Sequence, residues 1–325
     1  MQYQKDALTK FSQQIKHALQ AYTPHNININ DIDNIVICGL GGSGIAGRIV
    51  KSMYLNKSSV PIEVISDYFL PAYAGERTLT LQCSYSGNTE ETLAMYAEAK
   101  AKGCKIISLS TGGKLEEQTV ADGNIFYRAE TGFQPRMALG YGLTYLLLIL
   151  SELTGQNINA ELEAASNHVQ DYEVYITDAQ VIFENWKANL DHKTVIVTDY
   201  LTNPIGVRFA QQLQENAKAE AFVHELPESN HNVIETYYGE IKSHFLFLSS
   251  NSQPRTTLRF AFLKELLERN DNHVTEMNLI PNDLNSLVHM IYTQDWLSLI
   301  YADAKGVNSS KIENIVGLKS HLDNN

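Results

Sequence analysis

The sequence has little of what marks secreted or membrane proteins. Its 325 residues include only three cysteines, and an odd number does not suit a disulfide framework. Cys38 and Cys83 lie in apolar runs typical of strands, so buried reduced thiols are expected. The N-terminus has no apolar signal-peptide segment, and the longest apolar run, residues 143–150, is too short to span a bilayer and predicts a buried helix. These absences indicate a soluble cytoplasmic protein.

Positive charge and metal-ligand patterns are also scarce. Asp and Glu outnumber Lys and Arg by 37 to 25, which gives a formal net charge of −12. A net-acidic protein does not attract nucleic acid or an anionic membrane, so neither is an expected partner. The ten histidines are scattered without ligand spacing, so no metal and no other cofactor is expected. A small phosphate can still bind where local donors are arranged for it.

The layout predicts two α/β domains, as the length allows. Strand and helix patterns alternate in both halves, which predicts parallel sheets covered by helices on both faces. The predicted strands are residues 34–38, 62–66, 79–83, 105–109 and 125–127, then 194–198, 221–223 and 245–248. The expected parts are an N-terminal domain (1–153) with a lead-in helix (1–22), a helical connector (154–190) and a shorter second copy (191–325).

The most informative stretch is the turn after the third strand. An apolar run ends at Cys83 in small hydroxylated residues, and a helix pattern begins at Glu90. A helix N-terminus carries unsatisfied N–H donors and partial positive charge, which suits a phosphate. Ser84, Ser86 and Thr89 add hydroxyl donors. An ordinary helix cap with Thr89 as N-cap is the alternative, but the density of hydroxyls favours an anion site.

A glycine-rich turn follows the first strand in the same way. Gly39, Gly41 and Gly44 fit the dinucleotide fingerprint, and Asp67 could be its ribose-binding acid, so a nicotinamide-dependent oxidoreductase is kept as an alternative. Ser43 inside the loop, and the fuller phosphate cradle one strand later, favour a phosphate site instead. Both turns lie at the carboxyl ends of strands, where parallel sheets bind their ligands.

Several segments together resemble the bifunctional phosphoglucose/phosphomannose isomerase family. They are GLGGSGIAG (39–47), SYSGNTEET (84–92), FQPRMALGY (133–141), QLQENAKAEA (212–221), PESNHNVIE (227–235) and GVNSSKIENIVGLKSHL (306–322). The serine turn marks any sugar-isomerase (SIS) domain, whereas the ENAK and NHN segments are more specific. The resemblance covers the whole chain and implies two SIS domains, each a parallel-sheet αβα sandwich. It also implies interconversion of glucose 6-phosphate, and of mannose 6-phosphate, with fructose 6-phosphate.

The resemblance assigns roles to four residues. Aldose–ketose isomerisation needs a general base, a group that opens the sugar ring and a cation for the developing oxyanion. Glu215 would be the base, and Arg136 would stabilise the enediolate, a solvent-facing arginine being its alternative. His231 would protonate the ring oxygen and reach across from the partner subunit of a homodimer. Lys319 would assist ring opening, a terminal lysine on a solvent-facing surface being its alternative.

The remaining expected residues hold the substrate. The serine turn would bind its phosphate and the glycine loop would close over it, with Ser84, Ser86, Thr89, Gly42 and Ser43 as the donors and close contacts. Ser310 stands where the family has a threonine that makes room for either C2 epimer, so the hydroxyl is kept and a methyl is lost. This departure bears on the epimer preference.

Two other functions stay open. One is a SIS module that binds a sugar phosphate and senses it without turnover. The other is an isomerase of another phosphosugar, such as an amino sugar or a pentose phosphate. A sensor would not need Glu215, His231 and Arg136, so their presence favours an enzyme.

Overall fold

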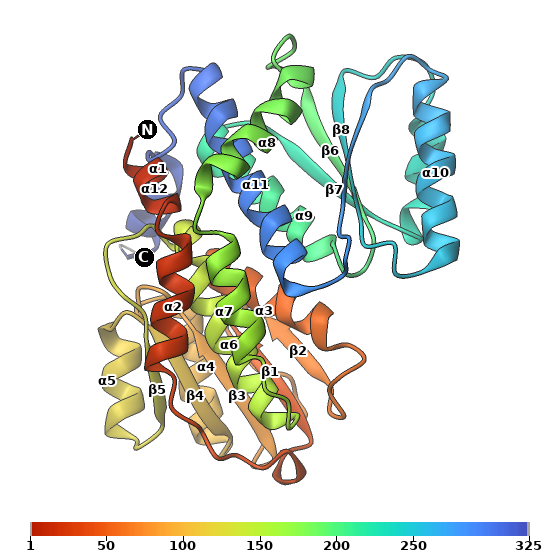
Figure 1. The fold of residues 1–325 in the computed structure, drawn as a ribbon. Helices are drawn as coiled ribbons and strands as arrows, with labels where there is room; N and C mark the ends of the chain where they lie inside the picture. The colour runs from red at the N-terminus through yellow and green to blue at the C-terminus, as the bar shows by residue number, and fades with distance from the viewer. Residues whose placement is uncertain (1, 324–325) are drawn as a thin grey trace. The chain divides into compact units, whose positions relative to one another are not determined.

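The computed structural model describes residues 2–323, which form two compact units, each built on one parallel sheet (Figure 1). The first unit is Thr9–Gln170, and the second consists of the chain up to Leu8 and from Asp171 onward. The α/β class expected from the strand–helix alternation is confirmed. The stretch expected as a helical connector contains α7 (Asn159–His168) and α8 (Tyr172–Trp186), of which α7 belongs to the first unit and α8 to the second.

The sheet of the first unit has the strand order β2-β1-β3-β4-β5, and neighbouring strands are parallel. The strands are β1 (Asn34–Cys38), β2 (Ile62–Ile65), β3 (Thr78–Cys83), β4 (Lys105–Ser110) and β5 (Ile125–Arg128). The order changes direction between β1 and β3. In open α/β sheets, ligands bind at the carboxyl ends of the two strands at such a point.

Helices cover both faces of this sheet. Val36 packs with Met95 and Leu115 on the face covered by α4 and α5, whereas Ile37 points to the opposite face and meets Gly47 of α3. On that second face α6 packs against α3 and α2, and α7 packs against α2. The helices are α2 (Phe11–Ala21), α3 (Gly41–Tyr54), α4 (Glu90–Ala101), α5 (Gly113–Ala121) and α6 (Leu139–Leu153), with short 3₁₀ turns at Ile29–Asp31 and Pro135–Met137.

The second unit repeats the strand order of the first, as expected of a shorter copy. Its four-stranded parallel sheet has the order β7-β6-β8-β9, so the direction changes between β6 and β8. The strands are β6 (Lys193–Thr198), β7 (Ala221–Glu225), β8 (Ser243–Ser249) and β9 (Val274–Asn278). The helices are α1 (Gln2–Leu8), α8, α9 (Asn203–Gln212), α10 (Pro254–Glu268), α11 (Leu284–Ala304) and α12 (Glu313–Asp323), with a π-helical turn at Leu213–Ala217 and 3₁₀ turns at Glu228–His231 and Val233–Thr236.

One expectation about the elements was wrong, and one strand was missed. The lead-in helix over residues 1–22 is two helices, because α1 ends at Leu8 and packs on α11, where Tyr292 Oη donates to the Leu8 carbonyl at 2.7 Å. The edge strand β9 was not predicted, since its sequence is largely polar and only Val274 and Thr275 are buried.

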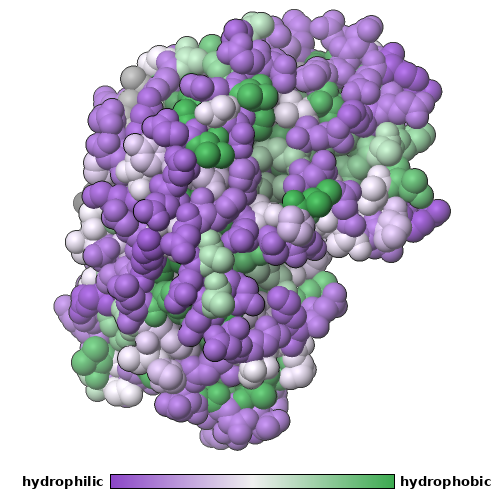
Figure 2. Space-filling view, in the orientation of Figure 1, coloured by the Kyte–Doolittle hydropathy of each residue, from purple (hydrophilic) through white to green (hydrophobic). Residues whose placement is uncertain are grey.

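The expected burial of residues 143–150 is confirmed, because every one of them is buried within α6. Among residues 2–323, no helix has the length and apolar content needed to cross a membrane. The face shown in Figure 2 is largely hydrophilic, and its apolar residues appear in separate patches. Scattered exposed apolar side chains of this kind are normal for globular proteins.

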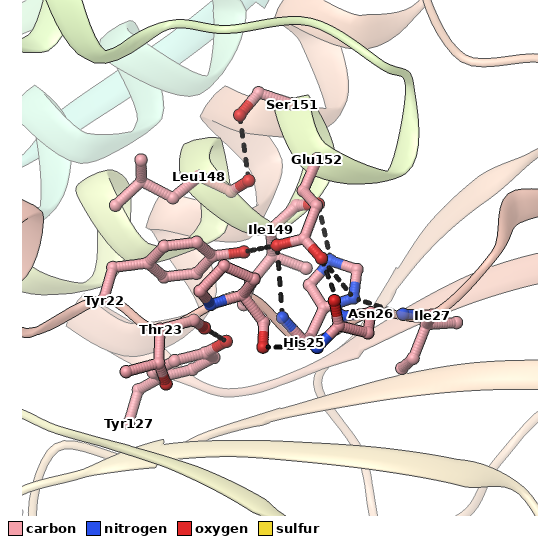
Figure 3. Close-up of polar contacts among 11 residues, drawn as sticks. Tyr22, Thr23, His25, Asn26, Ile27, Tyr127, Leu148, Ile149, Ser151 and Glu152 are labelled. Carbon is pink, nitrogen blue, oxygen red and sulfur yellow. Dashed lines mark hydrogen bonds and ion pairs between the residues drawn. The ribbon is translucent and has the colours of Figure 1, made fainter.

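A partly buried carboxylate holds the chain between α2 and β1 (Figure 3). Glu152, in the last turn of α6, accepts hydrogen bonds from Tyr22 Oη at 2.5 Å and from the backbone N–H groups of His25 at 3.1 Å and Asn26 at 2.7 Å. Burial alone would raise the pKa of Glu152, but the Tyr22 hydroxyl, these N–H groups and the His25 ring lower it below its ordinary value. The folded state therefore favours the charged form.

The same turn is held from two other directions. His25 Nδ1 accepts from the Ile27 N–H at 3.0 Å, and its Nε2 donates to the Ile149 carbonyl at 3.1 Å. Tyr127 Oη donates to the Thr23 carbonyl at 2.6 Å. These contacts join α6 and β5 to the segment that leads into β1 and so fix where β1 starts.

Glu152→Gln should lower the free energy of unfolding at neutral pH, because the neutral amide accepts these hydrogen bonds less strongly than the carboxylate. We expect a loss of about 1–2 kcal/mol. Since the folded pKa of Glu152 is lowered, its stabilisation is present above the unfolded pKa of about 4.3 and is lost as pH falls through the folded pKa.

Urea unfolding of the wild type and of Glu152→Gln, at about pH 7 and at about pH 3, tests this pH dependence of the free energy of unfolding. The difference between them should shrink at the lower pH. The exposed Glu163, changed to Gln, serves as the control and should leave stability unchanged. An equal difference at both pH values would show that the charge of Glu152 contributes nothing.

Candidate functional site

The glycine loop after β1 and the serine turn after β3 are bonded to each other at the carboxyl edge of the first sheet. Ser43 Oγ accepts a hydrogen bond from the Tyr85 N–H at 3.0 Å. Within the serine turn, Ser84 Oγ and Thr89 Oγ1 are hydrogen-bonded at 2.8 Å, and Ser84 is only 2% exposed. The structure thus brings Ser43, Ser84 and Thr89 together, as the sequence pattern predicts.

Thr89 takes the N-cap position of α4, but its side chain makes no capping hydrogen bond. The cap that the sequence offers as the alternative explanation is therefore not formed by the Thr89 hydroxyl, which pairs with Ser84 instead. The first N–H groups of a helix have no partners within the helix itself. An anion at this turn would meet these N–H groups together with the hydroxyls.

A small pocket lies beside this edge. Gly42, Ser43 and Ser84 line it, and its free volume is about 40 Å³, room for about three water molecules. Ser86 is placed differently: its side chain is exposed, and its Oγ accepts from the Asn88 N–H at 3.2 Å. Ser86 therefore lies outside the pocket, at the outer side of the serine turn.

The glycines of the loop permit close contacts inside the protein. A Cβ atom at Gly42 would lie 2.7 Å from the Pro135 carbonyl oxygen and 3.1 Å from the Arg136 nitrogen. A Cβ atom at Gly39 would lie 2.9 Å from the Cys83 carbonyl oxygen. Packing against neighbouring backbone thus accounts for the glycines at these two positions without a nucleotide.

Arg136 lies beside the glycine loop because its backbone contacts Gly42. It lies in the 3₁₀ turn Pro135–Met137, which begins with proline and leads into α6, and its residue surface is only 5% exposed. The solvent-facing alternative for Arg136 is therefore wrong. Its backbone lies against Gly42, which places the arginine next to the glycine loop.

In the second unit, Glu215 lies in the π-helical turn Leu213–Ala217 that ends α9. Glu215 is half-buried and lines a pocket together with Lys218, Lys311 and Ile315. Lys218 ends the turn in the left-handed conformation, with φ of +52°, and its Nζ donates to the Glu215 carbonyl and, at 2.7 Å, to the Lys311 carbonyl. Glu215 thus borders a pocket whose other wall is the start of α12 and the segment before it.

A buried polar network supports this turn. Arg208 Nη2 pairs with Asp295 Oδ2 at 2.6 Å, and Gln212 Nε2 donates to Asp295 Oδ1 at 2.8 Å. One turn further on, Asn216 Nδ2 donates to Ser298 Oγ at 2.9 Å. Arg208 and Asp295 are only 3% and 2% exposed, so the charges are shielded from water. π-Helical turns often occur at functional sites, and this one is fixed to α11 by residues spaced four apart.

The structure does not bring the other expected residues of the second unit into this pocket. His231 is exposed at the end of the 3₁₀ turn Glu228–His231, and Lys319 is exposed on α12. Ser310 is partly buried, and its N–H donates to Asn308 Oδ1 at 2.9 Å. Asn308 and Lys311, on either side of Ser310 in the chain, are among the residues that line the pocket with Glu215, but Ser310 itself is not.

Sequence reasoning missed some residues of both regions. Tyr141 lines the small pocket beside the serine turn, and its Oη donates to Glu130 at 2.7 Å. The supporting residues Arg208, Gln212 and Asn216 were also missed, although their spacing of four on one predicted helix was a usable signal. Among residues 2–323, no group of three His, Cys, Asp or Glu side chains is arranged to hold a metal ion.

Comparisons with known proteins agree with these observations. Residues 178–322 match the family model of the bacterial phospho-glucose isomerase C-terminal SIS domain. The C-terminal domain of glucosamine-fructose-6-phosphate aminotransferase from Francisella tularensis has a similar fold, with a TM-score of 0.70 over 94% of this chain and 97% of that chain, at 16% identity.

Two curated relatives are more similar in sequence. A D-glucosamine-6-phosphate 4-epimerase from Sulfolobus acidocaldarius is 33% identical over 219 residues, which is 67% of this chain and 68% of that protein. A bifunctional phosphoglucose/phosphomannose isomerase from Caldicellulosiruptor bescii is 34% identical over 312 residues, which is 91% of each chain. With this identity over nearly its full length, the chain belongs to the bifunctional phosphoglucose/phosphomannose isomerase family.

Proposed function

We propose that this protein is a cytoplasmic aldose–ketose isomerase that interconverts glucose 6-phosphate, and mannose 6-phosphate, with fructose 6-phosphate. The observation that carries the proposal is the similarity, over 91% of the chain, to a relative named bifunctional phosphoglucose/phosphomannose isomerase. The hydroxyl-lined edge of the first sheet supports it, because a phosphosugar needs such an anchor. The proposed partners are the phosphosugar and a second copy of the chain in a homodimer.

The phosphate would bind at the serine turn. Ser84 and Thr89 offer hydroxyls at the start of α4, and Ser43 and Gly42 border the adjoining pocket. Ser86 would contact the phosphate from the solvent side, where it is exposed. These donors are neutral and fixed to the backbone, so they would hold the ground state and the transition state equally.

Glu215 would be the general base. Its carboxylate would take the C2 proton of the open-chain glucose 6-phosphate, giving an enediolate, and return a proton to C1, giving fructose 6-phosphate. Arg136, a permanent cation, would stabilise the oxygen charge that develops at C1 and C2. His231 of the partner subunit would protonate the ring oxygen, and Lys319 would assist ring opening. This chemistry is proton transfer alone and is proposed to need no metal or cofactor.

A second candidate substrate is an amino-sugar phosphate, because the Sulfolobus acidocaldarius relative is named for D-glucosamine 6-phosphate. That similarity covers only 67% of the chain, so it supports the candidate less than the longer match supports the isomerase. Ser310 would influence the choice between C2 epimers.

An assay in EDTA tests the proposal. Formation of fructose 6-phosphate is measured from glucose 6-phosphate and, separately, from mannose 6-phosphate. Consumption of D-glucosamine 6-phosphate is measured as a third reaction, because its product keeps the amino group and is not fructose 6-phosphate. Turnover of the first two is expected. Turnover of glucose 6-phosphate alone would narrow the specificity. Turnover of the amino sugar alone would select the second candidate, and tight binding without turnover would indicate a sensor.

Glu215→Gln should lower kcat by about 10³-fold, the range expected for loss of a general base, and leave the affinity for the phosphosugar within a few-fold. Single-turnover rates and binding measured by calorimetry separate the two effects. Glu313→Gln is the matched control, since Glu313 lines the same pocket and has no proposed role. Unchanged turnover in Glu215→Gln would remove Glu215 from the role of base.

Ser84→Ala should raise KM about tenfold and change kcat little, because it removes an interaction made in both the ground state and the transition state. Ser86→Ala should raise KM less, since Ser86 is exposed and water competes for its hydroxyl. Steady-state kinetics of the two variants test whether KM rises more in Ser84→Ala than in Ser86→Ala. A Ser84→Ala enzyme impaired only in kcat would contradict the phosphate assignment.

A further inference from the structure

The second unit has a counterpart of the candidate phosphate site. The direction of its sheet changes between β6 and β8, as that of the first sheet changes between β1 and β3. Ser250 follows β8 directly, in the position that Ser84 has after β3. Directly after β6, however, stands Asp199, where the first unit has Gly39 after β1.

The carboxylate of Asp199 collects donors from both turns. Its Oδ2 accepts from the Ser250 N–H at 2.6 Å and from Ser250 Oγ at 2.7 Å. Its Oδ1 accepts from the N–H groups of Leu201 and Thr202, both at 3.1 Å, and from Thr202 Oγ1 at 3.0 Å. Asp199 is only 7% exposed, so its carboxylate charge is satisfied almost entirely by these protein donors.

A local turn explains only part of this arrangement. Bonds from an aspartate to the N–H groups two and three residues later are common in turns. Ser250 lies 51 residues away at the end of the neighbouring strand, so its two bonds are not local. In the first unit, Gly39 has no side chain, and a Cβ there would lie 2.9 Å from the Cys83 carbonyl oxygen. In the first unit the Ser84 N–H donates instead to the Leu109 carbonyl at 3.1 Å, so only in the second unit does a carboxylate join the two turns.

We propose that Asp199 is a built-in anion that fills the second unit's counterpart of the phosphate site, so that each chain binds one phosphosugar and binds it at the first unit. The part about the phosphosugar rests on the proposed function. The carboxylate takes the backbone and hydroxyl donors of both turns, and its negative charge repels a phosphate. Glu225, at the end of β7, feels the same charge: burial and the nearby Asp199 carboxylate raise the pKa of Glu225.

Asp199→Ala tests the proposal by chemical rescue. The variant keeps Cβ and loses only the carboxylate, so formate has the size and charge to replace the missing group. The variant should unfold at a lower temperature than the wild type, because the N–H groups of Ser250, Leu201 and Thr202 lose their acceptor. The Thr202 hydroxyl keeps the Leu248 carbonyl as an acceptor at 2.6 Å. Sodium formate should then raise its Tm by roughly 3 °C or more above the effect of sodium chloride at equal ionic strength. The wild type should show no such difference.

Two further variants make the test specific. Asp199→Asn keeps the shape but turns an amide toward the Ser250 N–H, so it should be destabilised and not rescued by formate, since the place is still filled. Asp199→Ala combined with Ser250→Ala should be rescued less than Asp199→Ala, because one donor to the added anion is gone. An Asp199→Ala protein that responds to formate no more than the wild type would overturn the proposal.

If Asp199→Ala does not fold, the proposal is tested by counting the phosphate sites of the wild-type protein. Equilibrium dialysis with labelled inorganic phosphate should find one site per wild-type chain, and Ser84→Ala should weaken that site. Two equivalent sites in the wild type would overturn the proposal. The formate experiment measures thermal stability and not turnover. If formate stabilises the Asp199→Ala variant but the wild-type protein has no isomerase activity, the proposed function is contradicted and the proposal for Asp199 is not.

Discussion

The candidate phosphate site depends on how closely backbone segments approach one another at the carboxyl ends of β1 and β3. The glycine loop, the serine turn and the turn that carries Arg136 meet there, and any side chain at Gly39 or Gly42 would collide with the backbone of a neighbour. Two glycines of the dinucleotide fingerprint, Gly39 and Gly44, follow from such contacts, since a Cβ at Gly44 would lie 2.3 Å from the Gly39 carbonyl oxygen. The third, Gly41, would meet no atom within 4 Å and has a φ of +51° instead. The same close approach brings Ser43 and Ser84 to one pocket.

The second unit has the same strand order but uses its polar groups internally. The Asp199 carboxylate accepts hydrogen bonds from N–H groups of the turns after β6 and β8. The Arg208–Asp295 ion pair joins α9 to α11. A buried ion pair of this kind contributes little net stability, but the loss of one partner costs about 3–5 kcal/mol because the other charge is left unpaired. Such a network favours one arrangement of the helix end. The turn that carries Glu215 is therefore anchored to α11 by buried hydrogen bonds, as the proposed role of general base would require.

What the sequence could predict depended on how far apart the interacting residues lie along the chain. Continuous apolar runs revealed the buried strands, and hydroxyls clustered within six positions revealed the serine turn. The strand β9 stayed hidden because an edge strand needs little apolar sequence. The π-helical turn at Glu215 and the anion at Asp199 depend on partners on other elements, 83 residues away for Gln212 and 51 for Asp199. No local pattern carries that information.

The turn that carries Glu215 is also connected to the C-terminal helix. Lys218 donates both to the Glu215 carbonyl and to the Lys311 carbonyl, so a single ammonium group holds the π-helical turn and the segment before α12 together. Lys319 lies two turns into α12. In the proposed reaction the ring must open before the C2 proton can move, and Lys319 and Glu215 would serve these successive steps. A shared anchor at Lys218 would keep the two groups in a constant relation while one substrate passes through both steps.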